Sequence, residues 1–296
     1  RTARLLEILE DEQVVNHDHA RLASREAMCR QRFNTESLRE DAEEEQWEED
    51  TGRSRTAIIP VYNAEGIPTA LGMIYAYALA HNGGVLQNSY HFRRDWVWDD
   101  GRLLHYTRRP AVYLISNYMW SHEANIEISR KVKELSPRSI TIHGGPDTPK
   151  YEEDARRYLE KYEHVDIIVR GEGEASATET LEKLAQTLDR GERDLSVLRD
   201  VEGITYRHNG RIHRNPDRAR IKDLDSIPSP FLGGLFDTYK GIPRLHATLE
   251  TNRGCPYGCT FCDWGSATSS KIRKFDLNRV LAELEWCSEA KVQSIA

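Results

Sequence analysis

The sequence lacks any hydrophobic run long enough to cross a membrane. Its longest strongly apolar stretch, residues 73–80, is far shorter than the roughly 20 residues that a membrane-spanning helix requires. The chain does not open with a charged start, an apolar centre and a small-residue end, which together would mark an export signal. These absences predict a cytoplasmic protein with no membrane partner.

Positive charge is in deficit as well. The chain has 41 Lys and Arg against 48 Asp and Glu, a formal net charge of −7. Such a surface repels phosphate backbones, which excludes broad electrostatic binding of nucleic acid. A small-molecule or peptide substrate is the expected kind of partner.

Cysteine is scarce and unevenly spread. Five cysteines in 296 residues are too few for a disulfide-dense scaffold. Cys29 and Cys287 stand apart, and we expect both to be ordinary structural residues. The other three, Cys255, Cys259 and Cys262, fall within eight positions. This crowding is typical of metal ligation in a reducing compartment.

The chain divides into four regions, in keeping with a length of about two domains. Residues 1–53 are polar, acidic and helix-prone, and we expect a helical extension. Residues 54–200 alternate short apolar strands with amphipathic helices, which predicts a Rossmann-like, doubly wound parallel sheet of the α/β class. Residues 201–245 combine a hairpin signal, centred on an Asn-Gly pair, with an extended linker. Residues 246–296 begin a further domain, and a strand that has barely started there suggests part of a longer protein.

Ligands of doubly wound sheets bind beyond the carboxyl ends of the strands. The predicted strands cover 56–61, 85–87, 111–115, 139–142 and 166–169, of which the second is the weakest. The predicted helices cover 69–81, 123–135, 152–162 and 175–188. Three strand ends carry glycine or turn residues, which lets the backbone approach a large ligand. These ends are 63–68, 143–146 and 170–173.

The clustered cysteines have the spacing C-x3-C-x2-C on a loop after a predicted strand. Three thiolates can bind three irons of a 4Fe-4S cluster and leave the fourth iron open to a substrate or cofactor. A zinc site is an alternative, because His246, Asp263 or Cys287 could supply a fourth ligand. An ordinary four-ligand electron-transfer cluster is another.

With Phe261 directly before the last cysteine, the motif reads C-x3-C-x-F-C and resembles the radical S-adenosyl-L-methionine (SAM) superfamily. The resemblance implies that SAM chelates the open iron and that an electron from the cluster cleaves SAM to a 5′-deoxyadenosyl radical. This radical would abstract a substrate hydrogen. The resemblance also implies that Phe261 lies near the adenine of SAM. Packing of Phe261 beneath the loop is compatible with that role. An external electron donor of the flavodoxin or ferredoxin type is expected.

Motifs that precede the cysteines narrow the resemblance to cobalamin-dependent radical SAM enzymes. Over about residues 55–296 the chain carries Ser-Asn-Tyr-Met-Trp, Gly-Gly-Pro, Val-Arg-Gly-Glu-Gly-Glu and Leu-Asp-Ser-Ile-Pro-Ser-Pro in the order and spacing of that family. The resemblance implies that the α/β region binds cobalamin. The implied contacts are Asn63, Glu65, Gly66, Ser116, Tyr118, Met119, Trp120, Gly144, Gly145, Pro146, Gly171, Glu172 and Gly173.

These contacts have alternative interpretations. Residues 118–120 could form a packed strand-to-helix corner, and the glycine-rich ends could be tight turns or a generic nucleotide site. A flavin or nicotinamide site is disfavoured because no G-x-G-x-x-G follows the first strand. Methylthiotransferases carry further cluster cysteines in their front domain, and this front domain has none after Cys29.

The lower face of the corrin is expected to lack a histidine ligand. The D-x-H-x-x-G signature that supplies one is absent. The histidines His19, His81, His91, His122, His143 and His164 do not lie in such a signature. The lower face would instead meet residues 63–68 or 118–120. A bulky apolar group such as Trp120 would there disfavour a sixth ligand on cobalt.

The sequence thus predicts a cobalamin-dependent radical SAM enzyme with a 4Fe-4S cluster, SAM and cobalamin as cofactors. Methyl transfer from methylcobalamin to a substrate radical, at an unactivated carbon or a phosphinate, is the expected reaction. The alternatives are a non-methylating enzyme that contracts or closes a ring, and an iron-sulfur electron-transfer or binding module. No catalytic side chain is indicated, and the segment alone is expected to be inactive.

Overall fold

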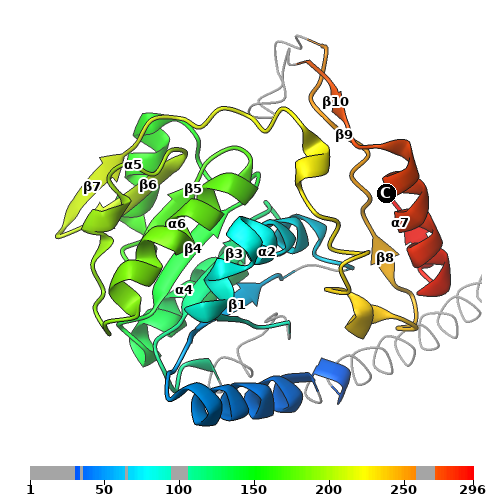
Figure 1. The fold of residues 1–296 in the computed structure, drawn as a ribbon. Helices are drawn as coiled ribbons and strands as arrows, with labels where there is room; N and C mark the ends of the chain where they lie inside the picture. Colours follow the sequence, from blue (N-terminus) through cyan, green and yellow to red (C-terminus); the bar gives the residue numbers. More distant parts are fainter. Residues whose placement is uncertain (1–30, 34–35, 64–65, 95–105, 258–270) are drawn as a thin grey trace, which may run out of the picture.

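A seven-stranded sheet forms the centre of the protein (Figure 1). The computed structural model describes residues 31–33, 36–63, 66–94, 106–257 and 271–296. The strand order is β2-β1-β3-β4-β5-β6-β7, parallel from β2 to β5 and antiparallel from β5 to β7. The strands are β1 (Thr56–Val61), β2 (Tyr90–Phe92), β3 (Val112–Ser116), β4 (Ile140–Gly144), β5 (Ile167–Val169), β6 (Ile204–His208) and β7 (Arg211–Arg214).

Helices cover both faces of this sheet, which confirms the predicted doubly wound α/β fold. The helices are α2 (Thr69–Ala80), α4 (His122–Leu135), α5 (Glu152–Lys161) and α6 (Gly173–Leu188). Strand side chains alternate, so Ile58 and Leu114 pack toward α2 and α6, whereas Ile59 and Ile115 pack toward α4. Helix α5 covers Ile168 on that second face. No helix in the described ranges is long and apolar enough to span a membrane.

The strand predicted over 85–87 is wrong. That segment forms the 3-10 helix η2 (Val85–Asn88), and the strand that pairs with β1 follows it as β2. Gly83 and Gly84 have φ values of +71° and +88°, so the chain turns out of α2 before it can extend. The other short 3-10 helices are η1 (His81–Gly83), η3 (Leu195–Leu198), η4 (Leu224–Ser226) and η5 (Asp237–Tyr239).

The predicted hairpin is confirmed as β6 and β7, and it continues the main sheet through the antiparallel pairing of β6 with β5. The following segment, expected to be an extended linker, contains short 3-10 turns and packs closely against the core. Phe231 and Phe236 are buried there. A Cβ at Gly72 would lie 2.2 Å from the Phe236 ring, so α2 requires glycine at this contact.

The last region contains a β-α-β unit that fits the predicted beginning of a barrel. Strands β8 (His246–Ala247) and β11 (Ser294–Ile295) pair in parallel, and α7 (Leu277–Glu289) connects them. Between β8 and α7, β9 (Asn252–Arg253) pairs antiparallel with β10 (Arg273–Lys274). In Figure 1 this unit lies beside the later part of residues 221–245 and close to α2.

The acidic amino-terminal region is helical over residues 36–51, in agreement with the prediction for that part of 1–53. Ion pairs of His91 with Glu44 and of Arg93 with Asp41 place this helix beside β2, at the edge of the sheet. Arg93 donates to Asp41, and Arg55 Nε donates to Glu44 at 2.9 Å. The helix therefore covers an edge whose backbone groups would otherwise be exposed to pairing with another chain.

Candidate functional site

The carboxyl ends of β1 and β3 lie side by side at the point where the strand order reverses. In sheets of order 2-1-3-4-5 this switch point is the usual place for a ligand. Tyr62 follows β1, and Tyr118 follows β3. Burial, with a smaller contribution from the neighbouring Tyr118, raises the pKa of Tyr62 to about 12. The loops after two adjacent strands thus converge at one edge.

Glycine at the end of β4 is required by a close backbone contact. Asn117 N donates to Gly144 O at 2.7 Å. Gly145 has φ +98°, and a Cβ there would lie 2.5 Å from Asn117 O. Around a Cβ built at Gly171, by contrast, no described atom lies within 4 Å. Gly145, Pro146 and Gly171 are exposed, so this edge offers bare backbone to a large flat ligand.

The loop after β3 presents large apolar side chains to solvent. Met119 and Trp120 are 79% and 68% exposed, and Trp120 stacks on Tyr118 with ring centroids 4.9 Å apart. A packed corner therefore does not describe Met119 and Trp120. They line a hollow of about 320 Å³ with His122, Glu123 and Asp147. Exposed apolar groups beside a hollow are typical of a ligand or partner surface.

A buried polar network supports this loop from below. Asn117 Nδ2 contacts His143 Nδ1 at 2.9 Å, and Asn125 Nδ2 donates to Asn117 Oδ1 at 2.9 Å. His143 Nε2 contacts Ser129 Oγ at 3.0 Å. Burial, aided by the nearby charges of other histidines, lowers the pKa of His143 to about 3. His143 is thus a neutral scaffold residue, and its contact with Asn117 was not predicted from any local pattern.

The loop after β1 is packed against the cysteine-bearing unit. Ile67 N donates to His246 O at 2.9 Å, and Thr69 Oγ1 donates to Thr248 O at 2.8 Å. Gly66 has φ +91°, and a Cβ there would lie 2.7 Å from His246 O. Asn63 is half-buried in the same loop, whereas Glu65 lies outside the described residues. Strand β8 is therefore attached at the carboxyl edge of the main sheet, although it belongs to a separate sheet.

Of the predicted cluster ligands, Cys255 is described and is half-buried. Cys259, Phe261 and Cys262 lie outside the described residues, so the cluster geometry stays a prediction. Within the described ranges no group of three or more His, Cys, Asp or Glu could hold a metal.

The candidates for a fourth zinc ligand have other surroundings. Cys287 is buried in the core, and burial raises the pKa of its thiol to about 11. His246 Nδ1 contacts Ser294 Oγ at 2.5 Å. Asp263 lies outside the described residues. The surroundings of Cys287 disfavour a zinc role, since a ligating thiol must be deprotonated.

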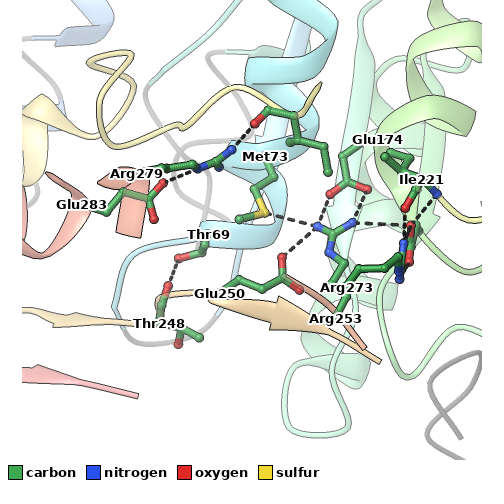
Figure 2. Close-up of polar contacts among 12 residues, drawn as sticks. Thr69, Met73, Glu174, Ile221, Thr248, Glu250, Arg253, Arg273, Arg279 and Glu283 are labelled. Carbon is green, nitrogen blue, oxygen red and sulfur yellow. Dashed lines mark hydrogen bonds and ion pairs between the residues drawn. The ribbon is translucent and has the colours of Figure 1, made fainter. Parts of the chain in front are cut away.

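Two arginines on the paired strands β9 and β10 meet two glutamates at the start of α6 (Figure 2). Arg253 Nη2 and Nη1 donate to Glu174 Oε1 and Oε2 at 2.5 and 3.2 Å. Arg273 Nη1 donates to Glu172 Oε2 at 3.1 Å. These ion pairs were not predicted, because they join residues far apart in the sequence. Helix α6 also begins at Gly173, two residues earlier than predicted.

Neighbouring charges and hydrogen bonds favour the charged forms of Glu172 and Arg253 despite their burial. Burial alone would raise the pKa of Glu172, but bonds from Arg273 and the Ile221 N–H and the charge of Arg253 hold it below its usual range. Burial would likewise lower the pKa of Arg253, and Glu174 with Glu250 outweighs that effect and raises it. The four side chains therefore form a charge-assisted link between the sheet and the segment that carries Cys255.

The remaining predicted contacts differ in accessibility. Ser116 is buried, and its carbonyl accepts from Asn125 Nδ2 at 2.8 Å. Glu172 and Gly173 are half-buried, and both oxygens of Glu172 are engaged by arginine. Gly144 is half-buried at the end of β4. The open part of the edge is formed by Met119, Trp120, Gly145, Pro146 and Gly171.

Comparison with known proteins finds curated relatives, although no family model matches the chain. The chain is 35% identical over 192 residues to 2-(S-pantetheinyl)-carbapenam-3-carboxylate methyltransferase of Streptantibioticus cattleyicolor. It is equally similar to the cobalamin-dependent radical SAM methyltransferase TokK of Streptomyces tokunonensis. Each match covers 63% of this chain and 27% of the relative. The anaerobic magnesium-protoporphyrin IX monomethyl ester cyclase of Rubrivivax gelatinosus is 32% identical over 182 residues, 60% of this chain and 29% of that protein.

Solved structures show the same fold. The cobalamin-dependent SAM radical enzyme OxsB, with aqua-cobalamin and SAM bound, matches 78% of this chain and 31% of its own chain at a TM-score of 0.52 and 20% identity. Its apo form matches 82% of this chain and 34% of its own at a TM-score of 0.57 and 19% identity. Sequence and fold together confirm the resemblance to cobalamin-dependent radical SAM enzymes, of which this chain spans about a third or less.

Proposed function

We propose that this chain is the front part of a cobalamin-dependent radical SAM methyltransferase that acts on a small-molecule or peptide substrate. The observation that carries the proposal is the link between two sites. The segment that contains Cys255 is joined by Arg253 and Arg273 to the helix that starts at the carboxyl edge of the sheet. A cluster and a corrin held at these two places would face a shared space, and such positioning is a large part of catalysis.

We assign the two groups to separate sets of residues. Cys255, Cys259 and Cys262 would hold a 4Fe-4S cluster with one open iron, and Phe261 would lie near SAM. Residues 54–200 would hold cobalamin, with Gly145 and Gly171 of the open edge among the residues that would contact it. When bound, the cluster would supply the electron that cleaves SAM, and cobalamin would carry the methyl group.

The chain's own side chains would prepare this edge. The stacked rings of Tyr118 and Trp120 would give the corrin an apolar contact surface and keep water from one of its faces. Asn117, held by His143 and Asn125, would fix the backbone from which these rings project.

The remaining partners follow from the same reaction. We propose an external electron donor of the flavodoxin or ferredoxin type, because the cluster must be reduced before each cleavage of SAM. The formal net charge of −7 supports a partner other than nucleic acid. We further propose a cytoplasmic site of action and a barrel that begins with residues 246–296.

A non-methylating reaction is the second candidate. The similarity to the cyclase of Rubrivivax gelatinosus favours it, since that name describes ring closure. Methyl transfer is preferred because two relatives named as methyltransferases are 35% identical to this chain.

Product analysis of the full-length protein separates the two reactions. The protein is purified anaerobically and its absorption spectrum is read for corrin and iron-sulfur bands. We expect one S-adenosylhomocysteine and one 5′-deoxyadenosine for each methylated product. Turnover that yields 5′-deoxyadenosine with an unmethylated product would support the cyclase-like candidate. An electron paramagnetic resonance spectrum of the reduced cluster that does not change with SAM would contradict both and favour an electron-transfer module.

A further inference from the structure

The base of the cysteine-bearing hairpin carries two arginines in register. Arg253 of β9 pairs with Arg273 of β10, and Cys255 follows Arg253 by two residues. Two neighbouring guanidinium groups repel each other unless anions separate them. The positions of those anions therefore decide where this part of the chain is held.

Glu174 binds Arg253 through both of its carboxylate oxygens. Its Oε1 accepts from Nη2 at 2.5 Å, and its Oε2 accepts from Nη1 at 3.2 Å. Glu250 accepts from the same Nη2 at 2.8 Å, and Met73 Sδ lies 3.3 Å from it. Figure 2 shows the guanidinium enclosed by these three side chains. A two-point bond of this kind fixes the orientation of the arginine as well as its distance.

Glu172 holds the second arginine. Both of its oxygens accept from Arg273, and Oε2 also accepts from Ile221 N at 3.1 Å. Arg253 Nη1 lies 3.7 Å from the same Oε2, so the two pairs share one network. Glu172 was predicted to contact cobalamin, and in the structure its carboxylate binds Arg273 of β10.

The network is enclosed and directional. The side chains of Arg253 and Arg273 are 11% and 13% exposed, and that of Glu174 is 4% exposed. Loss of Glu174 would remove the two-point bond to Arg253 and leave the guanidinium with Glu250 at 2.8 Å and Glu172 at 3.7 Å. The apolar cluster that contains Met73 and Phe275 has no comparable angular preference.

We infer that Glu172 and Glu174 are positioning residues that fix the cysteine-bearing hairpin relative to the carboxyl edge of the sheet. The inference rests on the proposed function, because it assigns the distance between cluster and corrin to these two side chains. They would act through Arg253 and Arg273 and touch neither cofactor. Glu172-x-Glu174 thus links the end of β5 to the iron-binding loop.

The test measures that distance in the full-length protein. Wild type, Glu174→Gln and Glu172→Gln are reconstituted anaerobically with iron, sulfide and cob(II)alamin, and the cluster is reduced. Dipolar coupling between the two paramagnetic centres is then read by electron paramagnetic resonance. We expect iron and corrin contents within about twofold of wild type and a coupling that is broadened or weakened at least twofold.

Lys133→Gln is the matched control. Lys133 Nζ lies 3.0 Å from Asp166 Oδ2, in an enclosed pair at the amino end of β5. This variant loses a comparable ion pair at the opposite edge of the sheet, so we expect its coupling to match wild type. A change of the same size in Lys133→Gln would overturn the inference, because it would show a general loss of rigidity.

A second measurement applies to variants that bind too little iron or cobalamin for the first one. In the protein without cofactors, amide hydrogen exchange across residues 246–257 and 271–276 should be at least tenfold faster in Glu174→Gln than in Lys133→Gln. Equal exchange and unchanged coupling in both glutamate variants would overturn the inference and leave the proposed function intact. Absence of iron or corrin from the wild type would overturn the proposed function and this inference with it.

Discussion

His143 shows how burial converts an ionisable side chain into a fixed support. Its folded pKa is about 3, against about 6.5 in an unfolded chain. Between these values the unfolded state binds a proton that the folded state does not, so stability falls as the pH falls from 6.5 toward 3. Above pH 6.5 neither state binds this proton, and the effect vanishes.

We expect His143→Gln to unfold more easily at neutral pH and to respond less to acid. Below pH 6 the wild type should lose about 1.4 kcal/mol more per pH unit than the variant. Urea unfolding of both proteins at intervals between pH 6.5 and 4.5 measures the difference. Parallel pH profiles would show that His143 accepts a proton in the folded state.

Gly145 and Gly171 form a natural pair for testing the bare edge. Both have positive φ, but a Cβ at Gly145 would meet Asn117 O at 2.5 Å whereas Gly171 faces open space. Gly171→Ala should cost about 1 kcal/mol from backbone strain alone, and Gly145→Ala at least about 2 kcal/mol, because contacts must also shift. Chemical denaturation checks the order, and equal losses would contradict the close contact.

For single residues, the sequence could indicate metal-ligating and ligand-facing positions more readily than it could indicate which side chains bind one another. The cysteine spacing and the glycine-rich strand ends are local patterns. The bond between Arg253 and Glu174 joins residues 79 positions apart, and nothing local links them. Asn117 and Asn125 were missed for the same reason, since an amide becomes informative only when burial forces it to find partners.

Helix α7 depends on a side chain that caps its amino end. Asp276 is its N-cap, and Oδ1 accepts from Asn278 N at 2.8 Å. Asp276→Ala should destabilise α7 by about 1 kcal/mol, while Asp276→Asn should retain most of the cap. Hydrogen exchange of peptides from Leu277–Glu289 distinguishes the two variants. Equal protection in both would mean that packing of Trp286 alone maintains the helix.

Elements with strong periodicity were predictable, and short edge elements were not. Strand β1 matches its predicted range because it is an uninterrupted apolar run buried on both faces. Strand β2 has three residues and is stabilised by pairing with β1, which no local pattern indicates. The strand was therefore predicted in the more apolar segment 85–87. The place of β6 beside β5 also depends on tertiary pairing, which a hairpin signal does not encode.

The whole molecule joins a rigid sheet to a β-α-β unit at one edge. Backbone bonds from Ile67 and a side-chain bond from Thr69 attach β8, and the arginine network attaches β9 and β10. Both attachments lie at carboxyl ends of strands, where the loops after β3 and β4 remain open. A ligand bound at that edge would therefore stabilise both the sheet and the β-α-β unit.

Ligand binding should consequently stabilise the whole molecule through mass action. Cobalamin at about 100 times its Kd should add about 2.7 kcal/mol, which corresponds to a rise in Tm of roughly 5–10 °C. Trp120→Ala should weaken this effect by about 1.4 kcal/mol, equivalent to tenfold in Kd. Because Trp120 is exposed, its loss should leave the Tm of the ligand-free protein nearly unchanged.

Leu135→Ala serves as the control for this experiment. Leu135 is an exposed apolar residue at the far end of α4, so it shares the chemistry of the substitution and lies away from the edge. Thermal unfolding of the three proteins, each with and without cobalamin, gives the comparison. If Trp120→Ala keeps the full ligand-induced rise, the corrin does not lie on the aromatic pair after β3. An equal loss in Leu135→Ala would trace the effect to α4 as a whole.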